Sequence, residues 1–141
     1  KMGYVLAPRE LMAEFRKGRA EAGLPAKDDD HVFVLHTYVT ESDAAARAEC
    51  KEAYDLYVKT RLYAKMHVYE DLIANGICLF GSVETVAEKM CQLHEMGIRH
   101  VSFLGNFGAL APERVERSMT RFARQVMPAV RARLGMKQAA E

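Results

Sequence analysis

The nine residues HVFVLHTYV, numbers 31–39, decide the fold class because they form a continuous run of mostly β-branched and aromatic side chains. Such a run is typical of a strand buried on both faces, as the strands of parallel sheets are. A second apolar segment, RHVSFLG at 99–105, predicts another strand. The connection between the two is far too long for a hairpin and must be a crossover, so the strands are expected to be parallel. The sequence therefore predicts a helix-rich α/β fold.

Helix boundaries are marked by prolines, capping residues and glycines. Pro8 suits the first position of a helix and Gly23 its end, while Ser82 is a capping residue. The short apolar segment ICLFG at 77–81 is interpreted as an entry into the next helix. Pro128 should kink or end the last helix, because it has no backbone N–H. The expected helical segments are 8–23, an insertion of helices over 42–80, 82–97 and 112–134.

Composition limits the classes of partner. The chain has 141 residues, of which 50% are hydrophobic and 28% charged, as expected for one soluble globular domain. The net charge of +1 gives no reason to expect a nucleic acid or a membrane as partner. Six arginines lie between 114 and 133; helical spacing favours a solvated face over a phosphate site for them.

The three cysteines Cys50, Cys78 and Cys91 show no CxxC pairing and no spacing with histidine that would hold a metal. We interpret them as small core residues of a protein in a reducing compartment, so the cytoplasm is the expected location and no metal is predicted. Two parallel strands with unpaired outer edges do not make a sheet that can stand alone. The pattern thus indicates part of a larger α/β fold.

Three stretches carry a resemblance to a known family. They are HTYVTESDAAARAE at 36–49, FGSVETVAEKMCQLHEMGIRHVSFL at 80–104, and NFGALAPERVERSMTRFARQVMPAVR at 106–131. In this order they resemble the carboxyl-terminal part of the bacterial luciferase-like monooxygenases, and the resemblance covers about residue 8 to 134. One departure is Val83, which stands where the family usually has proline, at the first position of a helix.

The resemblance implies a partial (β/α)8 TIM barrel consisting of the last two βα units. Residues 31–39 would be strand seven, 42–80 a helical lid insertion, 82–97 a helix, 99–105 strand eight and 112–134 the closing helix. The complete enzyme would use reduced flavin and O2 to oxidise a small organic substrate. Flavin mononucleotide is the favoured cofactor, and some relatives use a deazaflavin.

The missing strands of such a barrel would hold most of the flavin. We therefore expect the isolated chain to be inactive and to bind no flavin tightly. Its expected partner is the rest of its own barrel or another copy of itself in a homo-oligomer. The alternative is a non-catalytic association module that pairs with itself or completes the barrel of another chain.

Barrel enzymes place their sites at the carboxyl ends of strands, which gives four candidates for the flavin or substrate pocket: His36, Tyr38, Asn106 and Phe107. The alternatives are that His36 is a satisfied core histidine and that Gly105 and Gly108 only shape a tight turn, with Phe107 closing the barrel top. Lid candidates are Tyr63, His67 and Tyr69. Gly81–Ser82 could hold a phosphate, although helix capping is favoured. No catalytic residue is assigned.

Overall fold

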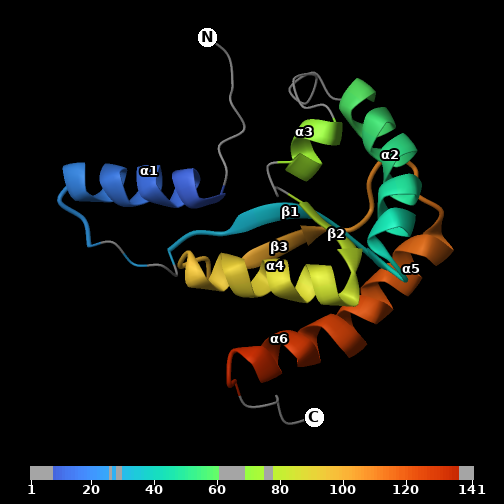
Figure 1. The fold of residues 1–141 in the computed structure, drawn as a ribbon. Helices are drawn as coiled ribbons and strands as arrows, with labels where there is room; N and C mark the ends of the chain where they lie inside the picture. The colour runs from blue at the N-terminus through green and yellow to red at the C-terminus, as the bar shows by residue number, and fades with distance from the viewer. Residues whose placement is uncertain (1–7, 26, 28–29, 61–68, 75–77, 137–141) are drawn as a thin grey trace.

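The computed structural model describes residues 8–25, 27, 30–60, 69–74 and 78–136 (Figure 1). Its elements, in chain order, are α1 Pro8–Glu21, β1 Phe33–Thr40, α2 Asp43–Thr60, α3 Tyr69–Ala74, β2 Cys78–Ser82, α4 Val83–Glu95, β3 Val101–Leu104, α5 Pro112–Arg121, a π-helical segment η2 Phe122–Val126, and α6 Met127–Arg133. Within this part of the chain, no helix is both long and apolar enough to cross a membrane.

The sheet has three parallel strands in the order β2-β1-β3. The amino-terminal half of β1 pairs with β3, where Leu35 lies beside Phe103, and its carboxyl-terminal half pairs with β2, where Tyr38 lies beside Phe80. Because β1 has a strand on each side, its unbroken apolar sequence is explained.

The third strand corrects the prediction of two strands. Residues 78–82 form β2, so the helical insertion does not extend to residue 80, and ICLFG is not an entry into a helix. A continuous apolar run of five residues fits a buried strand as well as the edge of a helix, and periodicity cannot separate the two. The segment is a strand because its backbone pairs with β1 from His36 to Thr40.

Alternate residues of β1 point to opposite faces of the sheet, and each face has its own core. Leu35 and Val39 pack with residues of α4, η2 and α6, including Val86 and Val126. Tyr38 packs on the other face with residues of α2 and α3. Figure 1 shows the same division, with α2 and α3 on one side of the sheet and α4 and α6 on the other. The described residues thus form an open α/β sheet that is covered on both faces.

The last helix is not the single helix predicted over 112–134. Its middle, Phe122–Val126, is π-helical, and the N–H of Met127 donates to the carbonyl of Phe122. Pro128 follows at the start of α6. In a regular α-helix the ring of Pro128 would meet the carbonyl of residue 124, and the wider π turn provides room for it. The proline therefore changes the helix locally without ending it.

The turn between β3 and α5 packs directly against α2 at Gly108. This glycine has φ +58°, and a Cβ there would lie 1.5 Å from the carbonyl oxygen of Ala53. At Gly105 the nearest atom to a Cβ would be Cγ of Met119, at 3.9 Å. Of the two glycines that flank Asn106 and Phe107, only Gly108 is required by packing. Its close approach is to a helix, as the turn-shaping interpretation expects.

We expect Gly108→Ala to destabilise the protein by more than about 3 kcal/mol, because either α2 or the turn must move. Gly18→Ala in α1 is the matched control, since nothing lies within 4 Å of its added Cβ. That variant should be more stable than the wild type by about 0.5–1 kcal/mol, because alanine is favoured inside helices. Urea unfolding of the three proteins measures both effects. A Gly108→Ala protein within about 1 kcal/mol of the wild type would contradict the packing described.

Candidate functional site

The predicted pocket residues gather on the face of the sheet that α2 covers. His36 and Tyr38 lie on β1, and Asn106 and Phe107 lie in the turn that follows β3. Because β1 and β3 are parallel neighbours, the turn after β3 lies next to the carboxyl-terminal half of β1. The structure brings His36 and Phe107 into contact.

His36 lies within a cage of aromatic rings. Its ring packs edge-on against Tyr54, Tyr57 and Phe107, with centroid distances of 5.4, 4.8 and 5.1 Å. Nε2 is buried and has no hydrogen-bond partner among the described residues. Burial lowers the pKa of His36 to about 4, because the cage disfavours the charged imidazolium. His36 is therefore neutral at pH 7, and its Nε2 is not satisfied as a core histidine requires.

Phe107 is a buried member of the aromatic cage around His36. It is only 3% exposed and stacks on Phe80, with a centroid distance of 5.5 Å and an interplanar angle of 18°. This burial agrees with the interpretation that Phe107 closes the structure, and the ring also packs edge-on against the imidazole of His36.

Tyr38 is fixed by a hydrogen bond that the sequence analysis missed. Its hydroxyl donates to Oε2 of Glu49 on α2 at 2.5 Å, and the side chain is 2% exposed. Burial, and then the bond to Glu49, raise the pKa of Tyr38 well above its usual value. The phenol thus remains protonated at physiological pH and ties β1 to α2.

Asn106 is exposed and lines two hollows. The first, of about 350 Å³, lies between α2 and the turn after β3, and its lining includes Tyr57, Thr60 and Phe107. The second, of about 480 Å³, lies between β3 and α5 and is mostly apolar; Thr37, Phe103, Leu104, Val115, Ser118, Met119, Phe122 and Ala123 are among the residues that line it. Asn106 therefore contributes its amide to the lining of both hollows, and no other pocket candidate lines both.

Of the three lid candidates, the structure describes only Tyr69, which does not line either hollow beside Asn106. Tyr63 and His67 lie outside the described residues. Tyr69 is 2% exposed, donates its hydroxyl hydrogen to the carbonyl of Arg47 at 2.9 Å, and packs near Phe80. Its visible role is to hold α3 against α2 and the sheet.

The amino terminus of α4 already holds a carboxylate. Asp43, at the start of α2, accepts hydrogen bonds from the N–H of Ser82 and the hydroxyl of Thr85, both at 2.7 Å. The side chain of Ser82 accepts from the N–H of Thr85, as a helix cap does. A Cβ at Gly81 would lie 2.8 Å from Oδ1 of Asp43. The capping interpretation is therefore confirmed, and Asp43 stands where a phosphate would bind.

The cysteines Cys50, Cys78 and Cys91 are free and buried, as expected of core residues. Among the described residues, no group of three or more histidine, cysteine, aspartate or glutamate side chains could hold a metal ion. The candidate site is a hollow with aromatic walls and an exposed amide, and the neutral imidazole of His36 packs against two of its lining residues, Tyr57 and Phe107.

Comparison with known proteins defines the class. The family model described as luciferase-like monooxygenase matches residues 6–100, and the chain belongs to this family. The resemblance found in the sequence is thereby confirmed, although Asn106 and Phe107 lie beyond the matched residues. A search of curated proteins gives no significant match.

Among solved structures, the chain is similar to the monooxygenase RslO1 from Streptomyces bottropensis, with 20% sequence identity and a TM-score of 0.62. The similarity covers 86% of this chain and 37% of that protein, so the chain spans just over a third of the length of RslO1. At this identity the likeness shows a shared fold.

We expect the bond between Asp43 and α4 to stabilise the protein in a pH-dependent manner. The pKa of Asp43 is lowered, first by the hydrogen bond from the N–H of Ser82 and then by the one from the hydroxyl of Thr85. The stability that this carboxylate contributes is therefore present above the ordinary aspartate pKa and is lost as the pH falls through the lower folded value. Asp43→Ala should cost about 1 kcal/mol at pH 7. Asp55→Ala, which removes an exposed pair with Lys51, is the control and should cost under about 0.5 kcal/mol. Urea unfolding at pH 7 and pH 3 tests this; equal losses at both pH values would contradict it.

We expect the imidazole of His36 to titrate near pH 4, where the pKa is lowered by burial. The unfolded chain takes up this proton near pH 6.5, so stability should fall as the pH drops from about 6.5 to 4. NMR titration of the ring protons measures the midpoint, and the spectrum of His36→Gln identifies the signal. A midpoint near 6.5 would mean that the aromatic cage is open to water.

Proposed function

We propose that the chain is the carboxyl-terminal segment of a monooxygenase that uses reduced flavin and O2 to oxidise a small organic substrate. Flavin mononucleotide is the proposed cofactor, with a deazaflavin as the alternative. The segment would provide one wall of the active-site mouth, and the remaining strands of the barrel would provide most of the flavin-binding contacts. Membership of the luciferase-like monooxygenase family supports this proposal.

The observation that carries the proposal is the hollow of about 350 Å³ that is lined by the rings of Tyr57 and Phe107 and by Asn106. Binding sites for flavins and organic substrates are typically apolar, with a few polar groups that fix orientation. Tyr57 and Phe107 supply aromatic walls to this hollow, and Asn106 supplies an amide. The described residues therefore fit the polar edge of a ring system or of an organic substrate.

When bound, reduced flavin would supply the electrons that activate O2. The residues of this chain would shape the pocket and orient the ligand. Tyr57 and Phe107 would exclude water, and Asn106 would orient the ligand through a hydrogen bond. His36, which packs against Tyr57 and Phe107, would be neutral and would place no positive charge next to these walls.

The surface of the chain supports a role as part of a larger assembly. Val34 is 65% exposed on the face of β1 that carries His36, and Phe103 is 42% exposed on β3. Within the described part, β3 pairs only with β1, so its outer edge has no strand partner. The rest of the barrel would cover these apolar side chains and pair this edge.

The same exposed edge supports the second candidate function, a non-catalytic association module. In that case β3 and its apolar neighbours would pair with a second copy or complete the barrel of another chain. This alternative predicts stable oligomers that neither bind reduced flavin nor consume O2.

The experiment uses the intact protein, in which this segment is joined to the rest of its barrel. Anaerobic titration with reduced flavin mononucleotide, followed by measurement of O2 consumption, should show binding and turnover. Asn106→Ala should weaken flavin or substrate binding by about tenfold, because a buried polar group of the ligand loses its partner. Gln92→Ala on α4, which removes an exposed amide bonded to Glu88, should change binding by less than about twofold.

Absence of both flavin binding and O2 consumption in the folded wild-type protein would overturn the proposal and favour the association module. Equal effects of Asn106→Ala and Gln92→Ala would remove Asn106 from the site.

A further inference from the structure

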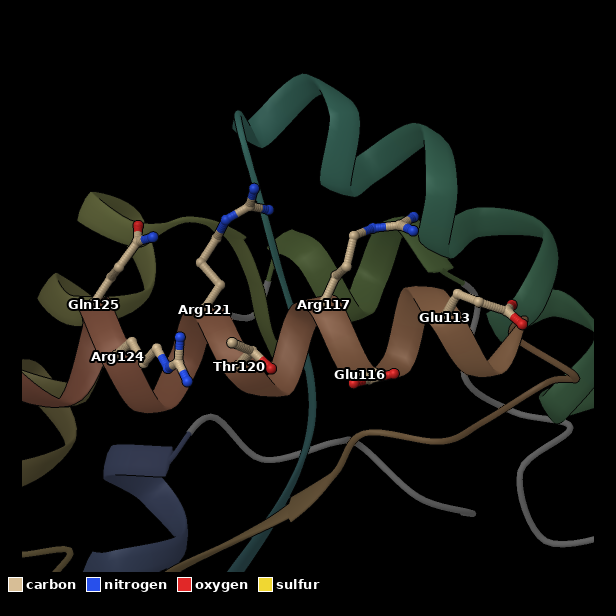
Figure 2. Close-up of a pocket in the computed structure, with 7 residues that line it drawn as sticks. All are labelled: Glu113, Glu116, Arg117, Thr120, Arg121, Arg124 and Gln125. Atoms are coloured by element: carbon tan, nitrogen blue, oxygen red, sulfur yellow. The ribbon is translucent and has the colours of Figure 1, made fainter.

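Three arginines form a stripe along one side of the closing helix. Arg117, Arg121 and Arg124 are spaced by four and three residues, so α5 and η2 place them on neighbouring turns of the same face. Figure 2 shows Arg117 and Arg121 projecting in the same direction, with Arg124 in the adjacent row. The sequence analysis expected these arginines to form a solvated face. The structure shows that they are concentrated on one side of the helix.

Two of the three arginines in this stripe form no ion pair within the described part of the chain. Arg117 and Arg124 are exposed and form no ion pair with any described carboxylate, while Arg121 pairs with Glu41 at 3.1 Å. Arg133, further along the same helix, differs because it pairs with Glu84 at 2.6 Å and with Glu88 at 3.4 Å. Among the described residues, Arg133 thus has two carboxylate partners, whereas Arg117 and Arg124 of the stripe have none.

The stripe borders a shallow hollow of about 460 Å³ whose lining is entirely polar in residue type: Glu113, Glu116, Arg117, Thr120, Arg121, Arg124 and Gln125. Charge is ordered along it, with the two glutamates at the amino-terminal end and the arginines beyond them (Figure 2). From Arg117 to Arg124 the helix rises by about 10 Å. The surface is therefore an elongated basic strip with an acidic end.

We propose that the arginine stripe is a docking site for an acidic protein segment. A helix with carboxylates at positions i, i+4 and i+7 has the same repeat as the three arginines, so each guanidinium can meet one carboxylate. The glutamates at one end fix the direction, because they repel a further acidic residue there. This inference does not depend on the proposed monooxygenase function.

Other anions fit the stripe less well. A single phosphate is compact, whereas the three arginines are spread over about 10 Å of the helix. The hollow has no aromatic lining on which a base or a flavin ring could stack, and no apolar anchor for a lipid surface. The stripe runs along one helix without interruption, and this shape suits a polypeptide segment better than the other anions considered.

The position of the stripe links docking to the candidate site. Arg121 also donates to the carbonyl of Val39, near the carboxyl end of β1, at 3.4 Å, and its carboxylate partner Glu41 directly follows this strand. An acidic partner would compete with Glu41 for Arg121. A docked segment would thus lie beside the end of the strand that carries His36 and Tyr38.

The test measures binding of a fluorescently labelled, alanine-based helical peptide of about 20 residues with glutamates at the matching spacing. Fluorescence anisotropy at low and high salt should show binding that weakens as salt rises. Arg117→Glu with Arg124→Glu should lower the affinity at least about tenfold. The control, Arg9→Glu with Lys17→Glu on α1, makes the same change in net charge and should lower it less than about twofold. Circular dichroism checks that each variant is folded. If the charge-reversal variant of the stripe fails to fold, Arg117→Gln with Arg124→Gln is measured in its place.

Equal losses in the stripe variant and the control would overturn the proposal, because binding would then follow net charge alone. So would the absence of peptide binding at low salt. Stripe-dependent binding of pyrophosphate, or of vesicles that contain phosphatidylserine, without binding of the peptide would also overturn it and would assign the stripe to a different ligand.

Discussion

The position of β1 between two strands, with its carboxyl-terminal part buried on both faces, is the constraint on which the rest of the structure depends. β1 pairs with β3 over its first half and with β2 over its second half, and its alternate side chains enter two separate cores. Beyond the last residue that pairs with β3, the N–H of Val39 donates to the hydroxyl of the buried Ser118 on α5 at 2.9 Å. The closing helix thus replaces strand pairing where β3 has ended.

Because the two faces of β1 are separated, one can be structural while the other carries the candidate site. The face with Leu35 and Val39 packs tightly against α4, η2 and α6. The other face carries His36, and three contacts hold α2 over it: Tyr38 with Glu49, Asp43 with Ser82, and Gly108 with Ala53. The aromatic pocket is therefore built from three elements distant in sequence, and its geometry depends on the position of α2.

The sequence predicted the parts of this arrangement that local patterns determine. HVFVLHTYV identified β1 because no polar residue interrupts its apolar core except His36 and Thr37, and the position of His36 in that strand made it a site candidate. The strand β2 was missed because five apolar residues carry no diagnostic period. Glu49 and Asp43 were missed because their partners lie 11 and 39 residues away, so only the fold brings them together. The arginine stripe could have been recognised from its spacing, but only the structure shows that no described carboxylate pairs with Arg117 or Arg124.

We propose that this chain carries one wall of a flavin site and that the site is incomplete without the rest of the barrel. The most direct test is the absorbance spectrum of the purified 141-residue chain, recorded on the same sample whose mass is measured by light scattering. The account predicts a folded protein without bound flavin, in which the exposed residues around Val34 and Phe103 are free or are covered by a second copy. A species that carries one tightly bound flavin per assembly would contradict it, because the segment would then be sufficient to build the site.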